Sequence, residues 1–287
     1  MRNTRQKTTD QPPTAVPTST GRPIIATVIG PKGGIGKTLV ARAAICRYHA
    51  AGVRPRIVQI DRTPVLPALY GEEVTAVALP TAEVQRNDPL ATMVALEPLS
   101  EAIDATIADG RPLVTDVGGG PSASATVEYI GKGRLDRHMQ GRARSVVIVP
   151  VTSDPSTMAL SMDLAEALEQ AHPSARFVCA LNHRDGPFRF FAGSAADEVQ
   201  RTRVRPFIER HASITIPPIP AGALQPFETL HLRFTQMIEA EPDDLARQVG
   251  LSRTMTAVLQ GDVAEWLAEV WGSFDTVLPL MTGGDDA

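Results

Sequence analysis

Residues 30–38 near the N-terminus read Gly30-Pro-Lys-Gly-Gly-Ile-Gly-Lys-Thr38 and decide how the whole chain is interpreted. The β-branched run before them, at 24–29, predicts a buried strand, and the stretch at 39–51 is rich in helix-forming residues. A glycine-rich turn between a strand and a helix is typical of loops that bind phosphate groups. We therefore expect an anion-binding loop at the end of the first strand.

The loop comes close to the pattern G-x-x-x-x-G-K-[ST] without meeting it in full. Gly36, Lys37 and Thr38 supply its last three positions. Its leading glycine falls on Pro31, and the nearest glycine, Gly30, is one place too early. The part that contacts phosphate is intact, so the departure leaves the prediction standing.

Each residue type in the loop has a chemical reason to be there. Gly33, Gly34 and Gly36 let the backbone turn tightly and point successive N–H groups at phosphate oxygens. Lys37 is expected to reach the β- and γ-phosphates, and the Thr38 hydroxyl is expected to be a Mg²⁺ ligand. The loop thus predicts a nucleotide as cofactor.

The rest of the chain alternates between strand-type and helix-type segments. Further strands are expected at 56–60, 113–115, 145–150, 176–181 and 213–216, with helices at 98–109 and 155–170 between them. Most of these strands are continuously apolar, as parallel strands covered on both faces must be. The fold expected is α/β, a doubly wound, mostly parallel sheet with helices on both faces.

Three parts of the chain differ in composition. Residues 1–22 are rich in Thr, Pro and Ser and are expected to be a disordered tail. Residues 23–238 are assigned to the nucleotide-binding domain, and residues 239–287 to a C-terminal helical segment packed on it. Two last helices are expected at 227–249 and 254–275.

Composition and charge exclude several classes of protein. No apolar run approaches the ~20 residues that cross a bilayer, and Cys46 and Cys179 form no CxxC pair, so a disulfide framework or zinc site is not expected. The net charge of −4 argues against a general nucleic-acid binder. However, residues 239–287 hold ten acidic and two basic side chains, which leaves residues 1–238 mildly basic. A cytoplasmic protein is expected.

The segment Lys32-Gly-Gly-Ile-Gly-Lys-Thr38 resembles the deviant Walker A motif of the ParA/MinD superfamily of P-loop ATPases. In that family an extra lysine, matched here by Lys32, crosses a nucleotide-sandwich dimer to the partner's phosphates. The resemblance covers roughly residues 24–220. It implies an ATPase that binds ATP and Mg²⁺ and forms a homodimer with ATP.

Two carboxylates extend this resemblance. Asp116, at the end of an apolar run, matches the family's Walker B aspartate and, with Gly119, its D-x-x-G switch; the resemblance makes it a second Mg²⁺ group beside Thr38. Asp61 matches the first aspartate of the family's D-x-D, but the second falls on Thr63, a poor substitute for a carboxylate base. Catalytic roles are therefore assigned to Lys32, Lys37, Asp61 and Asp116, and slow hydrolysis is expected.

Asn182 follows a buried-type strand at the place where the family puts its base-contacting asparagine. The run Asn182-His-Arg-Asp185 also has the spacing of the GTPase motif N-K-x-D, so Asp185 could read guanine, and a plain polar turn after the strand is the alternative. Lys32 favours ATP. The cofactor-binding residues implied are Gly33, Gly34, Ile35, Gly36, Lys37, Thr38, Leu39 and Asn182.

Two arginine-rich stretches and the last helix bear on partners. Residues 131–144 carry five Lys/Arg against one Asp, and four arginines lie within 201–210, so nonspecific DNA contact is one hypothesis and a solvated surface the other. The helix at 254–275 has an apolar stripe but an acidic polar face, which anionic lipid would repel. We expect it to pack on the core or on an unknown partner protein, and we expect no membrane binding.

The function expected is an ATP-dependent dimerising switch for partition or positioning of DNA, such as a plasmid, or of other cargo. One alternative is a nucleotide-held switch with little hydrolysis, acting in conjugation or another partner complex, as the Thr63 substitution allows. Another is a metabolite ligase or kinase on the same fold. ATPase assays with DNA and then with metabolites distinguish the three.

Overall fold

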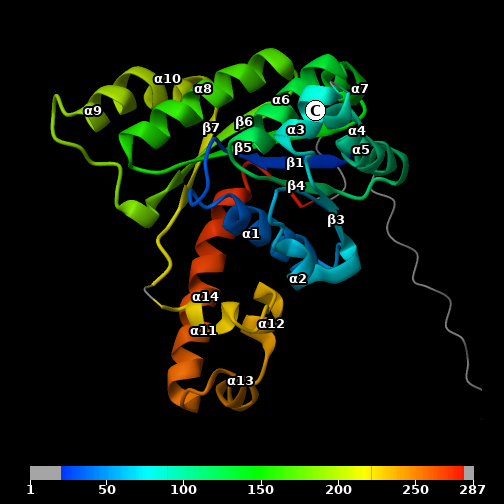
Figure 1. Cartoon of the computed structure of the whole chain (residues 1–287). Helices are drawn as coiled ribbons and strands as arrows, with labels where there is room; N and C mark the ends of the chain where they lie inside the picture. The colour runs from blue at the N-terminus through cyan, green and yellow to red at the C-terminus, as the bar shows by residue number, and fades with distance from the viewer. Residues whose placement is uncertain (1–20, 89, 221, 281–287) are drawn as a thin grey trace, which may run out of the picture.

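The computed structural model describes residues 21–88, 90–220 and 222–280. The expected tail at 1–22 lies outside these ranges except for its last two residues. Within them, seven strands form one parallel sheet in the order β3-β2-β4-β1-β5-β6-β7 (Figure 1). The strands are β1 (Ile24–Ile29), β2 (Arg56–Ile60), β3 (Val74–Val77), β4 (Leu113–Val117), β5 (Arg144–Val151), β6 (Arg176–Asn182) and β7 (Ala212–Ile216).

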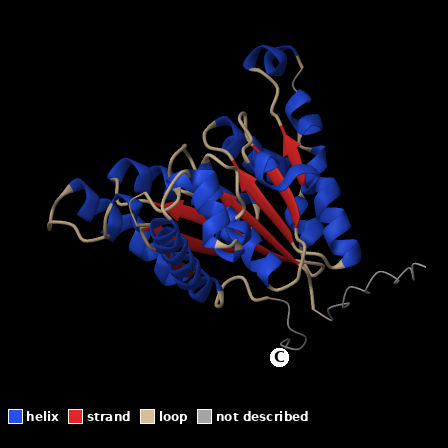
Figure 2. Cartoon of the chain, turned by 90° about the horizontal axis from the view of Figure 1, so that it is seen from below, coloured by secondary structure: helices blue, strands red, loops and turns tan. Residues whose placement is uncertain are grey.

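Helices cover both faces of this sheet (Figure 2). On one face lie α1 (Lys37–Ala50), α2 (Leu66–Tyr70) and α14 (Arg253–Phe274), and the same apolar cluster continues into α11 (Gln225–Glu228), α12 (Phe234–Glu239), which packs on α1 and α14, and α13 (Pro242–Val249), which packs on α14. The other packs against α4 (Ala91–Ala95), α5 (Glu97–Asp109), α6 (Pro121–Lys132), α7 (Leu135–Met139), α8 (Pro155–Ala171), α9 (Ala195–Val199) and α10 (Arg205–Arg210). Helix α3 (Ala82–Asn87) precedes α4. The doubly wound α/β fold expected from the sequence is confirmed.

The strand β3 has no counterpart among the expected strands. It has only four residues, and the two in its middle, Thr75 and Ala76, are exposed. It lies at the edge of the sheet and pairs on one side with β2. A short edge strand with exposed residues lacks the continuous apolar run that marks the central strands.

A single helix over 227–249 was the wrong expectation, because the structure divides this segment among α11, α12 and α13. His231 has a left-handed backbone with φ of 51°, which ends the first helical piece. Pro242 begins α13, and the residue before it, Glu241, is extended because a proline ring disfavours helical geometry there. The boundary expected between residues 238 and 239 falls inside α12.

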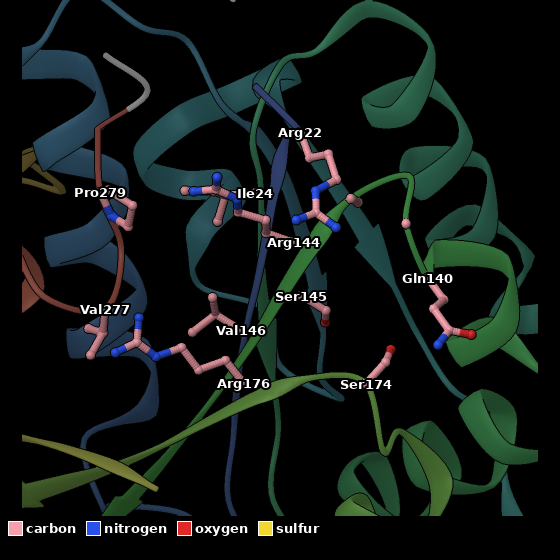
Figure 3. A pocket seen from close by; sticks show the side chains of 12 residues that line it. Arg22, Ile24, Gln140, Arg144, Ser145, Val146, Ser174, Arg176, Val277 and Pro279 are labelled. Atoms are coloured by element: carbon pink, nitrogen blue, oxygen red, sulfur yellow. The ribbon is translucent and has the colours of Figure 1, made fainter. Parts of the chain in front are cut away.

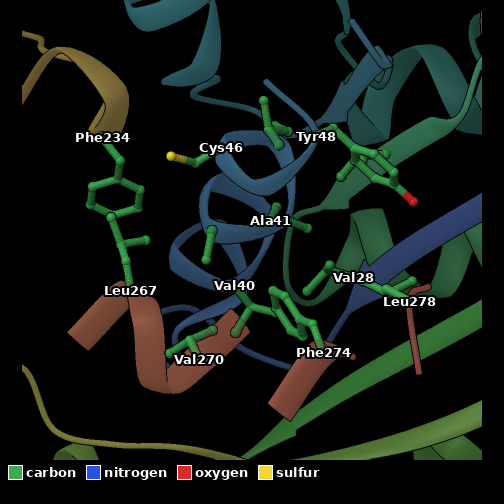
Figure 4. Packing of buried hydrophobic residues seen from close by; sticks show 14 of the residues in the cluster. Val28, Val40, Ala41, Cys46, Tyr48, Phe234, Leu267, Val270, Phe274 and Leu278 are labelled. Carbon is green, nitrogen blue, oxygen red and sulfur yellow. The ribbon is translucent and has the colours of Figure 1, made fainter. Parts of the chain in front are cut away.

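Helix α1 is buried around most of its circumference because it lies between the sheet and the C-terminal helices (Figure 4). Val40 of α1 lies among Val270 and Phe274 of α14 in one buried cluster. The Trp271 indole donates to the Ala43 carbonyl at 3.0 Å, and the Arg42 guanidinium lies 4.4 Å from the centre of the Phe234 ring. The C-terminal helices therefore buttress the helix that carries the phosphate-loop residues.

The apolar stripe of α14 packs inward, as expected: Val263, Trp266, Leu267, Val270 and Phe274 are buried and Trp271 is partly buried. The Trp266 indole donates to the Pro217 carbonyl at 2.9 Å. In the described part of the chain, no helix is long and apolar enough to cross a membrane.

Candidate nucleotide site

The loop after β1, at residues 30–36, has backbone conformations that glycine adopts easily. Gly34 and Gly36 have φ of 79° and 93°, a left-handed conformation that a Cβ would strain. A Cβ on Gly30 would collide with the side chains of Ile35 and Lys37. The glycine that stands one place too early for the pattern is thus required by close packing under the loop.

Helix α1 begins at Lys37, and no side chain caps its N-terminus. Its first N–H groups and the positive end of its dipole therefore remain directed at the loop, which is the usual arrangement at an anion site. Leu39 packs against the apolar cluster with its side chain, so any contact it makes with a nucleotide comes from its backbone.

The Lys37 ammonium is folded under its own loop. Only 7% of the residue is exposed, and Nζ donates to the Lys32 carbonyl at 2.6 Å. Burial lowers the pKa of Lys37, while the nearby charges of Asp116 and Asp61 act in the opposite direction. A lysine side chain is therefore held at the centre of the loop before any nucleotide binds.

Asp116 lies in β4 beside this lysine and is 2% exposed. Its Oδ2 accepts hydrogen bonds of 2.8 Å from the Thr38 hydroxyl and from the Gln59 amide. Burial raises the pKa of Asp116 to about 6, although these two hydrogen bonds and the Lys37 charge favour the ionised form. Its Oδ1 is buried and has no hydrogen-bond partner among the described residues.

An unpartnered buried carboxylate oxygen next to a threonine hydroxyl fits a hard cation with oxygen ligands. Mg²⁺ prefers such donors and usually keeps several waters, so one carboxylate and one hydroxyl are sufficient protein groups. The Thr38 and Asp116 pair predicted from the sequence is brought together at hydrogen-bond distance. These residues fit the metal.

Gln59 is a member of the site that the sequence did not reveal. It lies in β2, is 1% exposed, and its Oε1 accepts a 2.8 Å hydrogen bond from the Leu66 backbone N–H. The same amide donates to Asp116. Gln59 therefore couples the buried Asp116 carboxylate to the start of α2. The only sequence signal was a polar residue inside an otherwise apolar strand.

The segment after β4 lies directly on the phosphate loop. The Gly120 N–H donates to the Pro31 carbonyl at 2.7 Å, and a Cβ on Gly119 would come within 2.6–2.9 Å of the Lys32 and Gly33 backbone. A Cβ on Gly118 would lie 2.5 Å from Asp61 Oδ2. Glycines are needed here so that the two segments can touch, and any shift in one must move the other.

Lys32 points away from Lys37 and stays accessible, with 42% of its side chain exposed. Its Nζ contacts Asp154 Oδ2 at 3.2 Å and Ser156 Oγ at 3.4 Å. Hydrogen bonds from Ser156 and Thr157 hold the pKa of Asp154 well below its usual range, since Asp154 also caps α8. The extra lysine is therefore held at the rim of the site by a permanently ionised carboxylate.

Asn182 ends β6 and reaches the loop, but with its amide already engaged. Its Nδ2 donates to the Ile35 carbonyl at 3.0 Å, and its Oδ1 accepts from the Arg184 N–H at 3.1 Å. The Arg184 guanidinium also bonds the Gly34 carbonyl and, at 3.1 Å, Asp185. Asn182 and Arg184 thus hold the loop in place, and a contact between Asn182 and a base stays a prediction.

Asp61 and Thr63 lie at the end of β2, near the same edge of the sheet. Asp61 is partly exposed, and its Oδ1 accepts the Thr63 backbone N–H at 3.1 Å. The Thr63 side chain is exposed. Asp61 is therefore the carboxylate of this segment that lies against Gly118. Thr63 contributes its backbone N–H, which donates the hydrogen bond to Asp61.

The two arginine-rich stretches differ in their surroundings. In 201–210, Arg203 contacts Asp163 at 2.8 Å and Glu166 at 2.9 Å, and the other paired members are Arg201 with Glu198 and Arg210 with Glu169. Carboxylates of α8 and α9 therefore neutralise most of that stretch. In 131–144, Lys132 pairs with Glu128, while Arg134 and Arg137 are exposed.

Comparison with known proteins gives likeness at the level of structure only. No family model and no curated protein sequence matches the chain. Similar solved structures include apo McdA from Cyanothece, with 13% identity over 88% of this chain and 99% of that chain and a TM-score of 0.41. The ATP complex of a substituted McdA, also from Cyanothece, has 11% identity over 88% of this chain and 96% of that chain, with a TM-score of 0.38.

A third similar structure is the MinD cell division protein of Aquifex aeolicus. It has 13% identity over 83% of this chain and 97% of that chain, with a TM-score of 0.40. At these identities and TM-scores, the likeness to solved structures gives no information on the function of this chain.

Proposed function

We propose that this chain is a ParA/MinD-like ATPase that binds Mg²⁺–ATP at the carboxyl edge of its sheet. The observation that carries the proposal is Asp116, whose buried Oδ1 has no partner among the described residues while Oδ2 is held by Thr38 and Gln59. A buried polar atom without a partner is costly, so this geometry is what a metal site requires. The crevice beyond the strand ends on both sides of β1 is also where open α/β sheets bind ligands.

The residues present divide the work of holding a triphosphate. The backbone N–H groups of the glycine loop and of the first turn of α1 bind phosphate oxygens, and Lys37 neutralises their charge. Thr38 and Asp116 hold the metal, which when bound polarises the phosphoryl oxygens and shields their charge. Asp61 contacts the Gly118 turn and orients the attacking water as a general base.

The exposed Lys32 supports an ATP-dependent homodimer. Its ammonium is not needed by its own loop, since Lys37 already fills the buried position, and it lies at the rim within reach of a second copy. Binding across the dimer would replace the contact with Asp154. Such a dimer is a switch for positioning cargo, with DNA, for example a plasmid, as the first candidate, and the cytoplasm is its proposed compartment.

A second candidate, a nucleotide-held switch with little hydrolysis, is favoured by Thr63. Its side chain is exposed and no carboxylate stands in its place. Asp61 alone then carries water activation, and slow turnover would be in keeping with a partner that supplies the missing group.

The test is size-exclusion chromatography with light scattering in the presence of Mg²⁺ and a non-hydrolysable ATP analogue. Wild type is expected to dimerise, and Lys32→Ala is expected to stay monomeric while binding the analogue within about threefold of wild type. Lys132→Ala, an exposed lysine paired with Glu128, is the matched control and should dimerise. Identical oligomers for wild type and Lys32→Ala would refute the dimer; absence of analogue binding by wild type would refute the nucleotide site.

A further inference from the structure

A serine, a histidine and an aspartate form one hydrogen-bonded chain near the amino edge of the sheet. His172, the residue that follows α8, lies between Ser145 of β5 and Asp136 of α7. Its Nε2 lies 2.6 Å from Ser145 Oγ, and its Nδ1 lies 2.6 Å from Asp136 Oδ1. Ser145 is opposite Ile25 near the start of β1, whereas the phosphate loop follows the end of that strand. This cluster is therefore separate from the nucleotide site.

The positions of the protons in this chain follow from Asp136. Burial acts to raise the pKa of Asp136, but hydrogen bonds from Ser174 and His172 outweigh it and hold that pKa below its usual range. An ionised carboxylate only accepts hydrogen bonds, so Nδ1 of His172 is the donor in this contact. Burial lowers the pKa of His172, although Asp136 acts in the opposite direction, so the ring is neutral at pH 7. Nε2 is then an acceptor, and the Ser145 hydroxyl donates to it.

Asp136 holds the imidazole in this orientation and is itself held in place. Its Oδ1 accepts the Ser174 backbone N–H at 2.9 Å and the Ser174 hydroxyl at 2.6 Å. His172 is 1% exposed, so its ring is confined between its two partners. A hydroxyl that donates to a histidine, which in turn donates to a fixed carboxylate, is the arrangement that activates a serine as a nucleophile.

Ser145 is also one of the residues that line a pocket at this edge of the sheet (Figure 3). The pocket has a volume of about 320 Å³, at the lower end of the range for small-molecule sites. Val277 and Pro279, from the segment after α14, give it an apolar wall, and Gln140 and Ser174 add polar groups. A small molecule with an apolar group and a polar head is therefore the ligand that suits this lining.

We propose that Ser145 is a nucleophile that accepts the acyl group of a small carboxylic ester, with His172 as its general base. Ser145 Oγ bonds to the ester carbonyl carbon while its proton passes to His172 Nε2. The bond from that carbon to the alkoxy oxygen then breaks, and the departing oxygen takes the proton from Nε2. A water molecule, deprotonated by Nε2, next releases the acyl group as a carboxylic acid, and Nε2 returns the proton to Ser145 Oγ.

The first test is covalent labelling of the full chain, without nucleotide, by a fluorescent fluorophosphonate that loses fluoride to a nucleophilic serine. Peptide mapping is expected to find the label on Ser145. His172→Asn keeps an N–H for Asp136 but lacks Nε2, so it should label at least about 100-fold more slowly. The matched control Ser124→Ala removes an exposed serine of α6 and should label within twofold of wild type. Equal labelling of Ser145 and Ser124 in wild type would overturn the proposal.

A pH profile separates this role from a purely structural hydrogen bond and needs no variant. The labelling rate should be constant from pH 8 to about 6.5 and should fall at lower pH, because a proton on Nε2 removes the base. A rate that is the same at pH 5 and pH 8 would contradict His172 as the base.

The second test uses an ester, 4-nitrophenyl butyrate, again without nucleotide, so that its outcome is independent of the nucleotide site. Ser145→Ala, a conservative substitution, is expected to release 4-nitrophenol at least tenfold more slowly than wild type, while Ser124→Ala should match wild type. Thermal unfolding of each variant shows that the fold is retained. Equal release by Ser145→Ala and wild type would overturn the proposal.

Discussion

The two ends of the sheet use positive charge in different ways. At the carboxyl end, Lys37 is buried among Asp116, Asp61 and a backbone carbonyl, and Lys32 rests on Asp154. At the amino end, Arg22 and Arg176 are exposed in a pocket without a lining carboxylate among the described residues. The carboxyl end thus has its charges ordered by protein partners, whereas Arg22 and Arg176 at the amino end face solvent.

This difference predicts different responses to substitution. A preorganised site loses both binding and local stability when a member that satisfies buried partners is removed, but it gains stability when a buried charge that lacks a partner of its own is removed. Substitution of an exposed arginine such as Arg22 or Arg176 is expected to leave stability nearly unchanged, since exposed charges add little to it. Three substitutions at the carboxyl end test this contrast.

The largest effect is expected for Lys37→Ala. Removal of the buried ammonium leaves the phosphate charge unneutralised, so affinity for a fluorescent ATP analogue should fall by at least about 100-fold, or roughly 3 kcal/mol. Lys132→Ala should bind like wild type. Near-normal affinity in Lys37→Ala would place the nucleotide elsewhere.

The Gln59→Leu substitution tests the link between β2 and the metal-site carboxylate. It leaves the Leu66 N–H without its acceptor and Asp116 with one donor fewer. The free energy of unfolding should fall by about 2 kcal/mol in chemical denaturation. Gln248→Leu, at an exposed position of α13, should change it by less than about 0.5 kcal/mol. Equal stabilities of the two variants would show that the Gln59 bridge contributes nothing.

A smaller effect of opposite sign is expected for Asp116→Asn. The pKa of Asp116 is raised from 3.8 to about 6, so the folded state holds a proton that the unfolded state releases. Wild-type stability should therefore fall as pH rises from about 4 to about 6, by at most about 3 kcal/mol. Asparagine lacks this penalty but keeps only one acceptor oxygen, so a net gain of about 1 kcal/mol is expected at pH 8.

Thermal or chemical unfolding across pH 4–8 checks this sign, with Asp262→Asn as control. An asparagine variant that is less stable than wild type at pH 8 would contradict the assignment of an unpartnered, buried carboxylate. Gain of stability together with loss of metal-dependent binding is the expected signature of a site kept for function.

Local pattern predicted much of this molecule. Six of the seven described strands and the loop glycines follow from short-range signals, because glycine turns and buried parallel strands impose their residue types directly, whereas the Thr38–Asp116 pair was implied by the family resemblance. The edge strand β3 was not predicted, because its middle residues are exposed and lack the apolar run of a central strand. The division of the segment 227–249 at His231 and Pro242 was not predicted, because the helical spacing of its apolar residues was given more weight than its proline.

Features that depend on the tertiary arrangement could not be predicted from the sequence. Gln59 and Asp116 are far apart in sequence and meet because β2 and β4 pair in parallel. The same is true of Arg184, which reaches the Gly34 carbonyl 150 residues away. Pairing partners and register are set by the whole fold, so no window of sequence contains them.

The metal dependence of ATP binding tests the carboxyl-edge site most directly. Isothermal titration of wild type and Asp116→Asn with ATP, with Mg²⁺ and with EDTA, compares the two forms at pH 8. Mg²⁺ should tighten binding at least tenfold in wild type and by less than about twofold in Asp116→Asn. Equal tightening in both proteins, or none in wild type, would contradict a Mg²⁺–ATP site built on Asp116.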